Sequence, residues 1–148
     1  MEHVNEKYAI LEGLVPQSIA AAGNAVGAAV DLQGRHKFCV AVQLGAVAAG
    51  KSVTVALTTA DAADSTDAKE LDSVTYTAPA EGVTSHRVEL YGLVRPQMGR
   101  YLKVKVLNSG AAAVLASAVV IVDCTHYPED TGVTVKMVGK DAAGQPAG

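Results

Sequence analysis

The chain has 148 residues, a formal net charge of −3 and a hydrophobic content of 49%. This length suits one domain with a single core, and the composition is too apolar and too weakly charged for a disordered chain. The charge gives no electrostatic footprint for nucleic acid, and the longest apolar run, residues 110–122, is shorter than the ~20 residues of a membrane-spanning helix. We therefore expect a soluble, folded domain with neither nucleic acid nor membrane as a partner.

The first 24 residues have a mixed pattern and are predicted to form an extended N-terminal arm. Pro16 disfavours a continuous helix here, because proline excludes the helical conformation at the preceding residue. The apolar residues that precede it are Tyr8, Ile10, Leu11, Leu14 and Val15. The Ala-rich residues 18–29 fit either a short helix or the approach to a strand, and the pattern does not decide between them.

Two alternating segments follow the arm. Residues 38–44 place Phe38, Val40, Val42 and Leu44 at every second position, and residues 52–58 alternate valine and leucine with serine, threonine and alanine. This period of two is typical of strands with one buried face. Because a short loop containing glycines separates the two segments, we predict that they pair as a hairpin.

Three further strands are predicted after an exposed loop rich in Asp, Ser and Thr at residues 60–69. Residues 73–77 are rich in strand-forming side chains, and residues 84–91 alternate with Val88 and Leu90 on the inward face. Residues 101–106 alternate most regularly, with Lys103 and Lys105 on the face that we expect to be wet. Short strands at this spacing predict an all-β fold, an antiparallel β-sandwich or jelly roll.

The last strong segment, residues 114–124, is apolar on both faces, which is typical of a central strand or of one that meets another subunit. The candidate subunit-contact residues in it are Val114, Val120 and Val122. The sequence therefore predicts an N-terminal arm over residues 1–24, a sandwich over residues 25–127 and a C-terminal tail over residues 128–148.

One motif resembles a nucleotide-binding loop. Residues 45–52, Gly-Ala-Val-Ala-Ala-Gly-Lys-Ser, match the phosphate-binding pattern, and Asp123 follows an apolar run as a magnesium ligand would. The loop binds phosphate only when a helix begins at the serine, so that its first N–H groups meet the anion. Because residues 53–59 alternate as a strand, we expect an ordinary loop, with nucleotide binding as the alternative.

No other pattern predicts chemistry. Cys39 and Cys124 lie in apolar runs and are interpreted as small hydrophobic residues, although a disulfide between them stays possible. The four histidines lack metal-ligand spacing, and the acidic residues of segment 61–72 lack the calcium-loop order. No recognisable signature for a catalytic serine or cysteine is present. We predict a protein without enzymatic activity, metal or cofactor.

Three segments together resemble a pattern found in structural proteins of tailed bacteriophages. A strand that ends in a Gly-Ala loop at Gly45-Ala46 leads to a second Val/Thr strand after Gly50, and Arg100-Tyr101 opens a later alternating strand. The chain thus resembles the capsid decoration, or cement, proteins. The resemblance implies a small jelly-roll or sandwich protein, made in the host cytoplasm, that sits on the outer capsid surface as a homotrimer near local three-fold axes.

This resemblance implies two partners, the major capsid protein and further copies of the chain. The arm residues Tyr8, Ile10, Leu11, Leu14 and Val15 are the candidate capsid contacts, with cover of the protein's own sandwich as the alternative role. A tail or fibre-base component and a carbohydrate-binding sandwich are competing interpretations. The scarcity of aromatic residues argues against the latter, because sugar sites usually place ring faces on the ligand.

Overall fold

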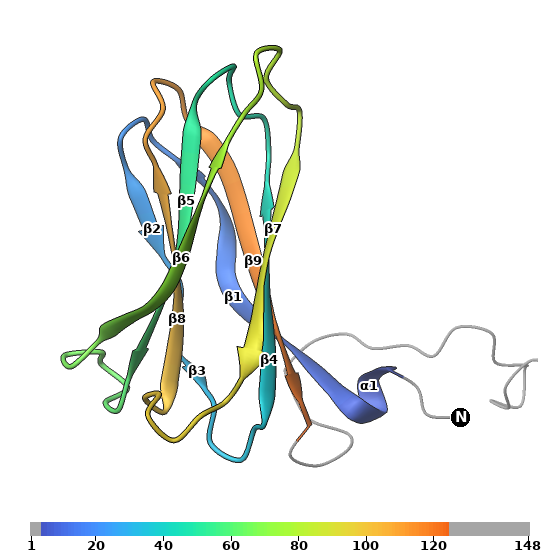
Figure 1. Ribbon diagram of the computed structural model, residues 1–148, viewed down its shortest axis with the longest axis vertical. Helices are drawn as coiled ribbons and strands as arrows, with labels where there is room; N and C mark the ends of the chain where they lie inside the picture. Colours follow the sequence, from blue (N-terminus) through green and yellow to red (C-terminus); the bar gives the residue numbers. More distant parts are fainter. Residues whose placement is uncertain (1–3, 125–148) are drawn as a thin grey trace, which may run out of the picture.

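The computed structural model describes residues 4–124, and these form strands together with one short helical turn (Figure 1). The elements are α1 (Val4–Lys7), β1 (Tyr8–Ile19), β2 (Asn24–Val26), β3 (Val30–Asp31), β4 (Lys37–Leu44), β5 (Ser52–Ala60), β6 (Lys69–Thr77), β7 (His86–Leu93), β8 (Tyr101–Asn108) and β9 (Val114–Asp123). Within this range, no helix has the length and apolar character needed to cross a membrane. The all-β prediction is confirmed.

The strands form two antiparallel sheets packed face to face. Sheet A has the order β1-β9-β4-β7, and sheet B has the order β2-β8-β5-β6, with β3 also paired to β8. The pairs are nested, because β1 pairs with β9, β2 with β8, β4 with β7 and β5 with β6. This nesting of a long folded hairpin is the jelly-roll arrangement, so the predicted fold class is confirmed.

The predicted hairpin between the two alternating segments, residues 38–44 and 52–58, is wrong. The two strands, β4 and β5, lie in different sheets, and the loop over residues 45–51 crosses from one sheet to the other. Val47 in this loop is buried and forms an isolated bridge with Val83. The alternation correctly predicted a buried face on each strand, but both faces point into the same core from opposite sides.

Most of the segment expected to form an N-terminal arm is a strand of the sandwich. Strand β1 pairs with β9 along its length, with shifts in register after Glu12 and after Leu14. These irregularities interrupt the inward and outward alternation, which explains why the segment looks mixed in sequence. The predicted C-terminal tail, residues 128–148, lies outside the described residues.

The core lies between the sheets and is built from small aliphatic side chains. Val40 and Val42 of β4 face Val53 and Val55 of β5, and all four are completely buried. Strand β8, between β2 and β5, alternates buried and half-buried residues throughout, as its sequence predicted. The core therefore contains Leu, Val and Ala from both sheets and a single phenylalanine, Phe38.

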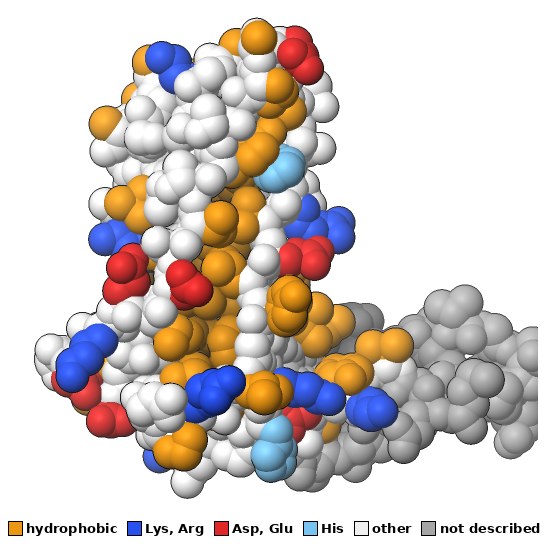
Figure 2. All heavy atoms as spheres, in the orientation of Figure 1, with side chains coloured by type: hydrophobic (Ala, Val, Ile, Leu, Met, Phe, Trp, Pro, Cys, Tyr) orange, Lys and Arg blue, Asp and Glu red, His pale blue; other side chains and the backbone are white. Residues whose placement is uncertain are grey.

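The two long sides of the sandwich differ. On one side β1 lies against β2 and β3, and the buried Gly27 approaches the Gly13 backbone so closely that no side chain fits at Gly27. On the other side the edges of β6 and β7 stay apart, and apolar side chains are visible between them as a band down the molecule (Figure 2). We call these the closed side and the open side.

Candidate assembly surface

The outer face of sheet A carries a cluster of apolar side chains and, beyond Ser117 on β9, the separate apolar side chain of Leu115. Strand register brings Ile10 beside Ile121, Ile121 beside Cys39, and Cys39 beside Tyr91, in one row across all four strands. We call the whole set the apolar face. Its members are Ile10, Cys39, Ala41, Tyr91, Leu93, Leu115, Val119 and Ile121.

Several of these side chains are unusually exposed for their type. Tyr91 is 82% exposed, Leu115 63%, Leu93 60% and Ile10 51%. A soluble domain buries such residues where it can, and contiguous exposed apolar groups typically mark a site of interaction. The apolar face is therefore the surface of this molecule best suited to contact another protein.

Shallow hollows lie on either side of the central row of the apolar face. One is bordered by Tyr8, Cys39, Tyr91 and Ile121, and the other by Ile10, Glu12, Ala41 and Val119. Depressions lined mainly by apolar groups can accept protruding side chains of a partner, which is how the energetically important residues of interfaces are usually seated.

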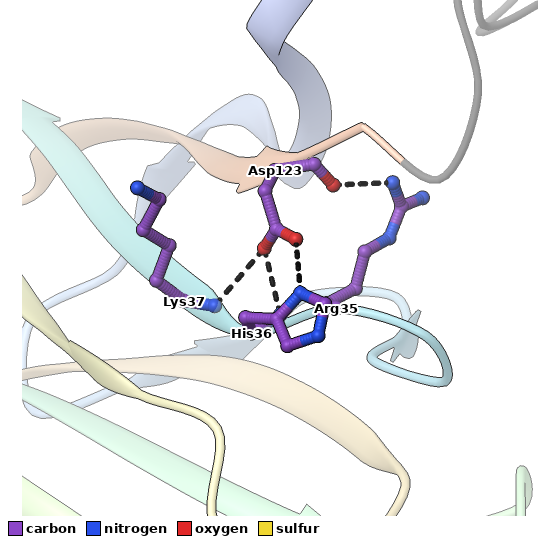
Figure 3. A network of polar contacts seen from close by, with 4 residues as sticks. All are labelled: Arg35, His36, Lys37 and Asp123. Carbon is purple, nitrogen blue, oxygen red and sulfur yellow. Dashed lines mark hydrogen bonds and ion pairs between the residues drawn. The ribbon is translucent and has the colours of Figure 1, made fainter.

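A polar network borders one end of the apolar face (Figure 3). The Asp123 carboxylate at the end of β9 accepts hydrogen bonds from the backbone N–H groups of His36 and Lys37, at 2.8 and 3.0 Å, and lies 2.9 Å from His36 Nδ1. Arg35 Nη1 donates to the Asp123 carbonyl oxygen at 2.8 Å. The network fastens the end of β9 to the start of β4.

The ionisation of Asp123 follows from these contacts. Burial by itself raises the pKa of this carboxyl, but the hydrogen bonds from the backbone of His36 and Lys37 and from the His36 ring lower the pKa to about 2. The carboxylate is therefore ionised at neutral pH. Two of its hydrogen-bond donors are backbone N–H groups of β4 and the residue before it, so the carboxylate has a structural role. The resemblance of Asp123 to a magnesium ligand has no counterpart in this geometry.

The outer face of sheet B is polar by comparison. Hydroxyl pairs cross from β5 to β6, with Ser52 2.7 Å from Thr77 and Thr54 2.8 Å from Thr75. Lys103 and Lys105 occupy the outward positions of the neighbouring strand β8. This face resembles an ordinary solvated sheet surface, so the two outer faces of the sandwich are chemically distinct.

The five candidate capsid contacts all lie on β1 but point in different directions. Ile10 and Val15 are about half exposed, and Ile10 belongs to the apolar face. Tyr8 is half-buried, with the Lys37 ammonium group 5.3 Å from its ring centre, and Leu11 packs against the core. Leu14 is buried at 2% exposure and has no surface to offer a partner.

The three candidate subunit-contact residues lie in the protein's own core. Val114, Val120 and Val122 are at most 4% exposed and face sheet B. The alternate positions of β9 face outward, and they place Leu115, Val119 and Ile121 on the apolar face. The central position of β9 between β1 and β4 explains why the strand is apolar on both faces.

The phosphate-loop pattern does not form a phosphate site. Strand β5 begins at Ser52, which confirms that the backbone continues in extended form where a nucleotide site needs a helix. The loop N–H groups are also occupied: Val47 donates to Val83, Gly50 to Ala78 and Lys51 to Ala48. Gly50, with φ of 69°, makes the turn that leads into the strand.

The remaining candidate groups are structural too. Within residues 4–124, no three His, Cys, Asp or Glu side chains are placed to hold a metal ion. In the exposed acidic loop, the Asp67 carboxylate accepts hydrogen bonds from the backbone N–H groups of Asp61 and Ala62, and these bonds lower its pKa. Cys39 and Cys124 do not form a disulfide.

Comparison with known proteins shows a shared fold. No protein-family model and no curated protein sequence matches the chain. The PBSX exported protein XepA superposes with a TM-score of 0.54 at 13% identity, over 99% of this chain and 49% of XepA. This chain thus spans about half of XepA.

Two other solved structures match nearly their whole length. A CBM4 structure has a TM-score of 0.53 at 9% identity, covering 81% of this chain and 88% of that one. The PRD1 vertex protein P5 has a TM-score of 0.50 at 12% identity, covering 80% of this chain and 96% of that one. Identities this low establish a common jelly-roll architecture and nothing finer.

Sequence reasoning missed most of the apolar face. Tyr91, Leu93 and Leu115 were not singled out, because each is an ordinary apolar residue until register places it beside the others. The sequence feature that could have indicated this surface is the second apolar face of β9, with Leu115, Val119 and Ile121 at outward-facing positions.

Proposed function

We propose that this protein is a non-enzymatic structural component of a tailed-phage virion that binds the outer surface of the capsid and stabilises it. The observation that carries the proposal is the exposed apolar face of sheet A, opposite a polar face on sheet B. Its support from known proteins is the fold shared with the PRD1 vertex protein P5. The major capsid protein is the proposed partner.

The proposed assembly is a homotrimer near the local three-fold axes of the capsid. A single apolar face with shallow hollows offers a modest contact, and three such contacts on one rigid trimer act at a high effective concentration. Weak individual contacts would then give firm attachment. A protein with this task needs a rigid core and an adhesive surface, and it needs no catalytic group.

We assign the contacts to exposed residues on these same strands. Ile10 and Val15 of β1, together with Tyr8 at the start of the same strand, are proposed to meet the capsid. Leu115 and Val119, on the outward parity of β9, are proposed to take the subunit-contact role in place of the buried valines of that strand. Both proposed contacts, to the capsid through β1 and to other subunits through β9, use side chains that the fold leaves exposed.

The first test compares two variants that place a charge at equally exposed positions. Ile10 is 51% exposed on the apolar face, and Val26 is 52% exposed on the outer face of sheet B. We expect Ile10→Asp to weaken co-sedimentation with capsids of the same phage about tenfold, because a charge would be buried in the contact. Val26→Asp should bind as the unmodified protein does.

Both variants should unfold at the denaturant concentration of the unmodified protein, because both side chains are exposed. Native mass measurement on each variant separates loss of the trimer from loss of capsid binding. Equal binding by the two variants, or an equal loss in both, would remove the apolar face as the basis of the proposal. Binding to purified tails and not to capsids would favour a tail or fibre-base component.

One observation favours a carbohydrate-binding role as the second candidate. Tyr91 is the most exposed large apolar side chain and borders a hollow, and aromatic rings often stack on sugars. The fold is also shared with a CBM4 structure. Binding to an immobilised polysaccharide that Tyr91→Ala abolishes would support this role.

A further inference from the structure

A groove on the open side of the sandwich reaches the core. Its floor includes Phe38 of β4 and Leu57 of β5, which are only 7% and 2% exposed. Its walls come from the edges of both sheets and from the connection after β7, namely Leu71, Asp72, Glu89, Leu90, Leu93 and Met98. Figure 2 shows apolar atoms along this band between the two edges.

The inner face of β6 is not covered on this side. Val74 lies opposite the buried Val55 of β5 and therefore faces inward, yet it is 40% exposed. Leu71 lines the groove and is 37% exposed. Because the inner residues of a sandwich are ordinarily buried between its sheets, these side chains favour a further element that covers the open side.

Strand β7 borders the groove and has a free edge. It pairs with β4 on one side, and no strand among residues 4–124 pairs with the other. Just past the end of β7, the Val94 N–H group donates to the His36 carbonyl oxygen at 2.8 Å. Because backbone groups alternate between the two sides of a strand, the even-numbered residues of β7 bond to β4, and Arg87 and Glu89 direct theirs to the free edge. Such an edge is a template for a further strand.

This edge carries one basic and one acidic side chain, two residues apart. Arg87 and Glu89 are both more than half exposed, with Arg87 Nη1 3.8 Å from Glu89 Oε2. They flank Val88, which is buried and faces the core with Val42 of β4. An antiparallel copy of the same strand would therefore present the opposite charge to each of them.

We propose that two copies of the chain join edge to edge through β7, antiparallel about a two-fold axis at Val88. Arg87 of each copy then lies opposite Glu89 of the other on the outer face, and their backbones exchange hydrogen bonds. Val88 lies opposite its counterpart on the inner face, and His86 lies opposite Leu90. The two four-stranded A sheets become one continuous sheet.

Charge and hydrogen bonding select this register together. An axis at Arg87 or at Glu89 would place like charges directly opposite each other, which is destabilising, whereas the axis at Val88 pairs opposite charges twice. An axis between two residues would pair groups that point to the free edge with groups already bonded to β4, so no ladder could form.

The same axis lies level with the exposed inner face of β6. The rings of Tyr76 and His86 stack across the open side. Two residues further from this stack along the two strands are Val74 and Val88, so Val74 lies at the level of the axis. In the pair the open sides of the two copies face each other, and each copy covers inner apolar side chains of the other.

The proposed pair does not compete with the contacts assigned above. It uses the edge of sheet A at β7, whereas the proposed capsid and trimer contacts use β1 and β9. A pair would link a subunit of one trimer to a subunit of a neighbouring trimer. This inference is independent of capsid binding and goes beyond the proposed function.

A disulfide placed on the axis tests the pairing. In a chain with Cys39 and Cys124 replaced by serine, Val88→Cys brings two thiols opposite each other, with Cα atoms about 4.5 Å apart, which allows a disulfide. Leu90→Cys is the matched control, because its two copies lie about 13 Å apart along the strands. On non-reducing gels, covalent dimers should form at least about tenfold faster with Val88→Cys.

The other outcomes are equally definite. No covalent dimer with Val88→Cys would overturn the proposal, and equally rapid dimers with Leu90→Cys would overturn the assigned axis. Hydrogen exchange identifies a different occupant of the edge. The Arg87 and Glu89 amides should become protected as the concentration of the unmodified protein rises, and protection that does not depend on concentration would overturn the proposal in favour of a segment of the same chain.

Charge reversal tests the ion pairs across the axis. In the Val88→Cys chain, Arg87→Glu places acidic side chains opposite each other, and Glu89→Arg places basic ones there. Both positions are exposed, so neither variant should lose its fold. Each variant alone should form covalent dimers about tenfold more slowly, and an equal mixture of the two should recover the original rate. Equal rates for the separate and mixed variants would contradict the assigned register.

Discussion

Along the closed side the two sheets meet through their backbones, whereas along the open side a stack of two side-chain rings spans the edges of β6 and β7. Gly27, directly after β2, lies against the backbone of Gly13 on β1 on the closed side. Across the open side, the rings of Tyr76 and His86 stack with their centres 3.6 Å apart, at the end where β6 stops and β7 begins. Beyond that stack the groove is uncovered.

The difference indicates where the molecule tolerates change. A backbone contact leaves no room for an added atom, because neither partner can rotate away. A side-chain bridge can adjust its rotamers, and the groove beside it is already open to solvent. We therefore expect substitutions on the closed side to cost far more stability than comparable ones on the open side.

The largest effect should come from Gly27→Ala on the closed side. A Cβ at this position would lie 1.7 Å from the Gly13 carbonyl oxygen and 2.8 Å from its carbon, so the two strands would have to separate. We expect a loss of about 3 kcal/mol or more in the free energy of unfolding, measured by urea titration.

Gly92→Ala is the matched control on the open side. Gly92 lies on β7, and an added Cβ would lie 3.4 Å from Phe38 Cζ, which is ordinary van der Waals contact. This variant should unfold within about 1 kcal/mol of the unmodified protein, because alanine also restricts the unfolded chain. Equal destabilisation by the two variants would show that the two sides do not differ.

A smaller loss is expected for Asn108→Ala, which removes a polar tie at the end of the closed side. The buried Asn108 Nδ2 group donates to the carbonyl oxygens of Ile19, Ala20 and Ala112, and its Oδ1 accepts from the Gly110 N–H group. Truncation would remove these bonds from the Ile19 and Ala112 carbonyl oxygens and from the Gly110 N–H group, whereas the Ala20 carbonyl oxygen keeps its bond from the Gly23 N–H group. We expect a loss of about 2 kcal/mol in the free energy of unfolding, measured in the same titration.

Ser109→Ala is the neighbouring control for this tie. The exposed Ser109 hydroxyl donates to the Ser52 carbonyl oxygen at 2.8 Å, and both groups can be solvated when the bond is lost. The cost should be below about 1 kcal/mol. If Asn108→Ala were no more destabilising than Ser109→Ala, the amide would not be holding the closed side together.

The sequence predicted most strands but not their neighbours. The alternation in β4, β5 and β8 is strong because each has one face in the core, and it therefore predicts burial directly. Pairing depends instead on which sheet a strand joins, and the jelly roll pairs β4 with β7 across a long stretch of chain. Proximity in sequence favoured a hairpin with β5 that the fold does not contain.

The candidate surface was less predictable than the fold, for a related reason. Ile10, Cys39 and Ile121 form one row only because three strands meet in a specific register. The same register buries Val120 and Val122, which the sequence alone could not distinguish from the outward residues of β9. A surface assembled from distant strands leaves no local motif, whereas the false phosphate loop is entirely local.

The smallest effect is expected at the side-chain bridge of the open side. Tyr76→Leu removes the ring that stacks on His86 but keeps an apolar side chain against the core. The free energy of unfolding should fall by about 1 kcal/mol, the usual range for an aromatic pair beyond its buried area. Tyr76→Phe keeps the ring and should leave the urea midpoint nearly unchanged. A loss from Tyr76→Leu as large as that from Gly27→Ala would mean that the open side depends on one fixed contact as strictly as the closed side does.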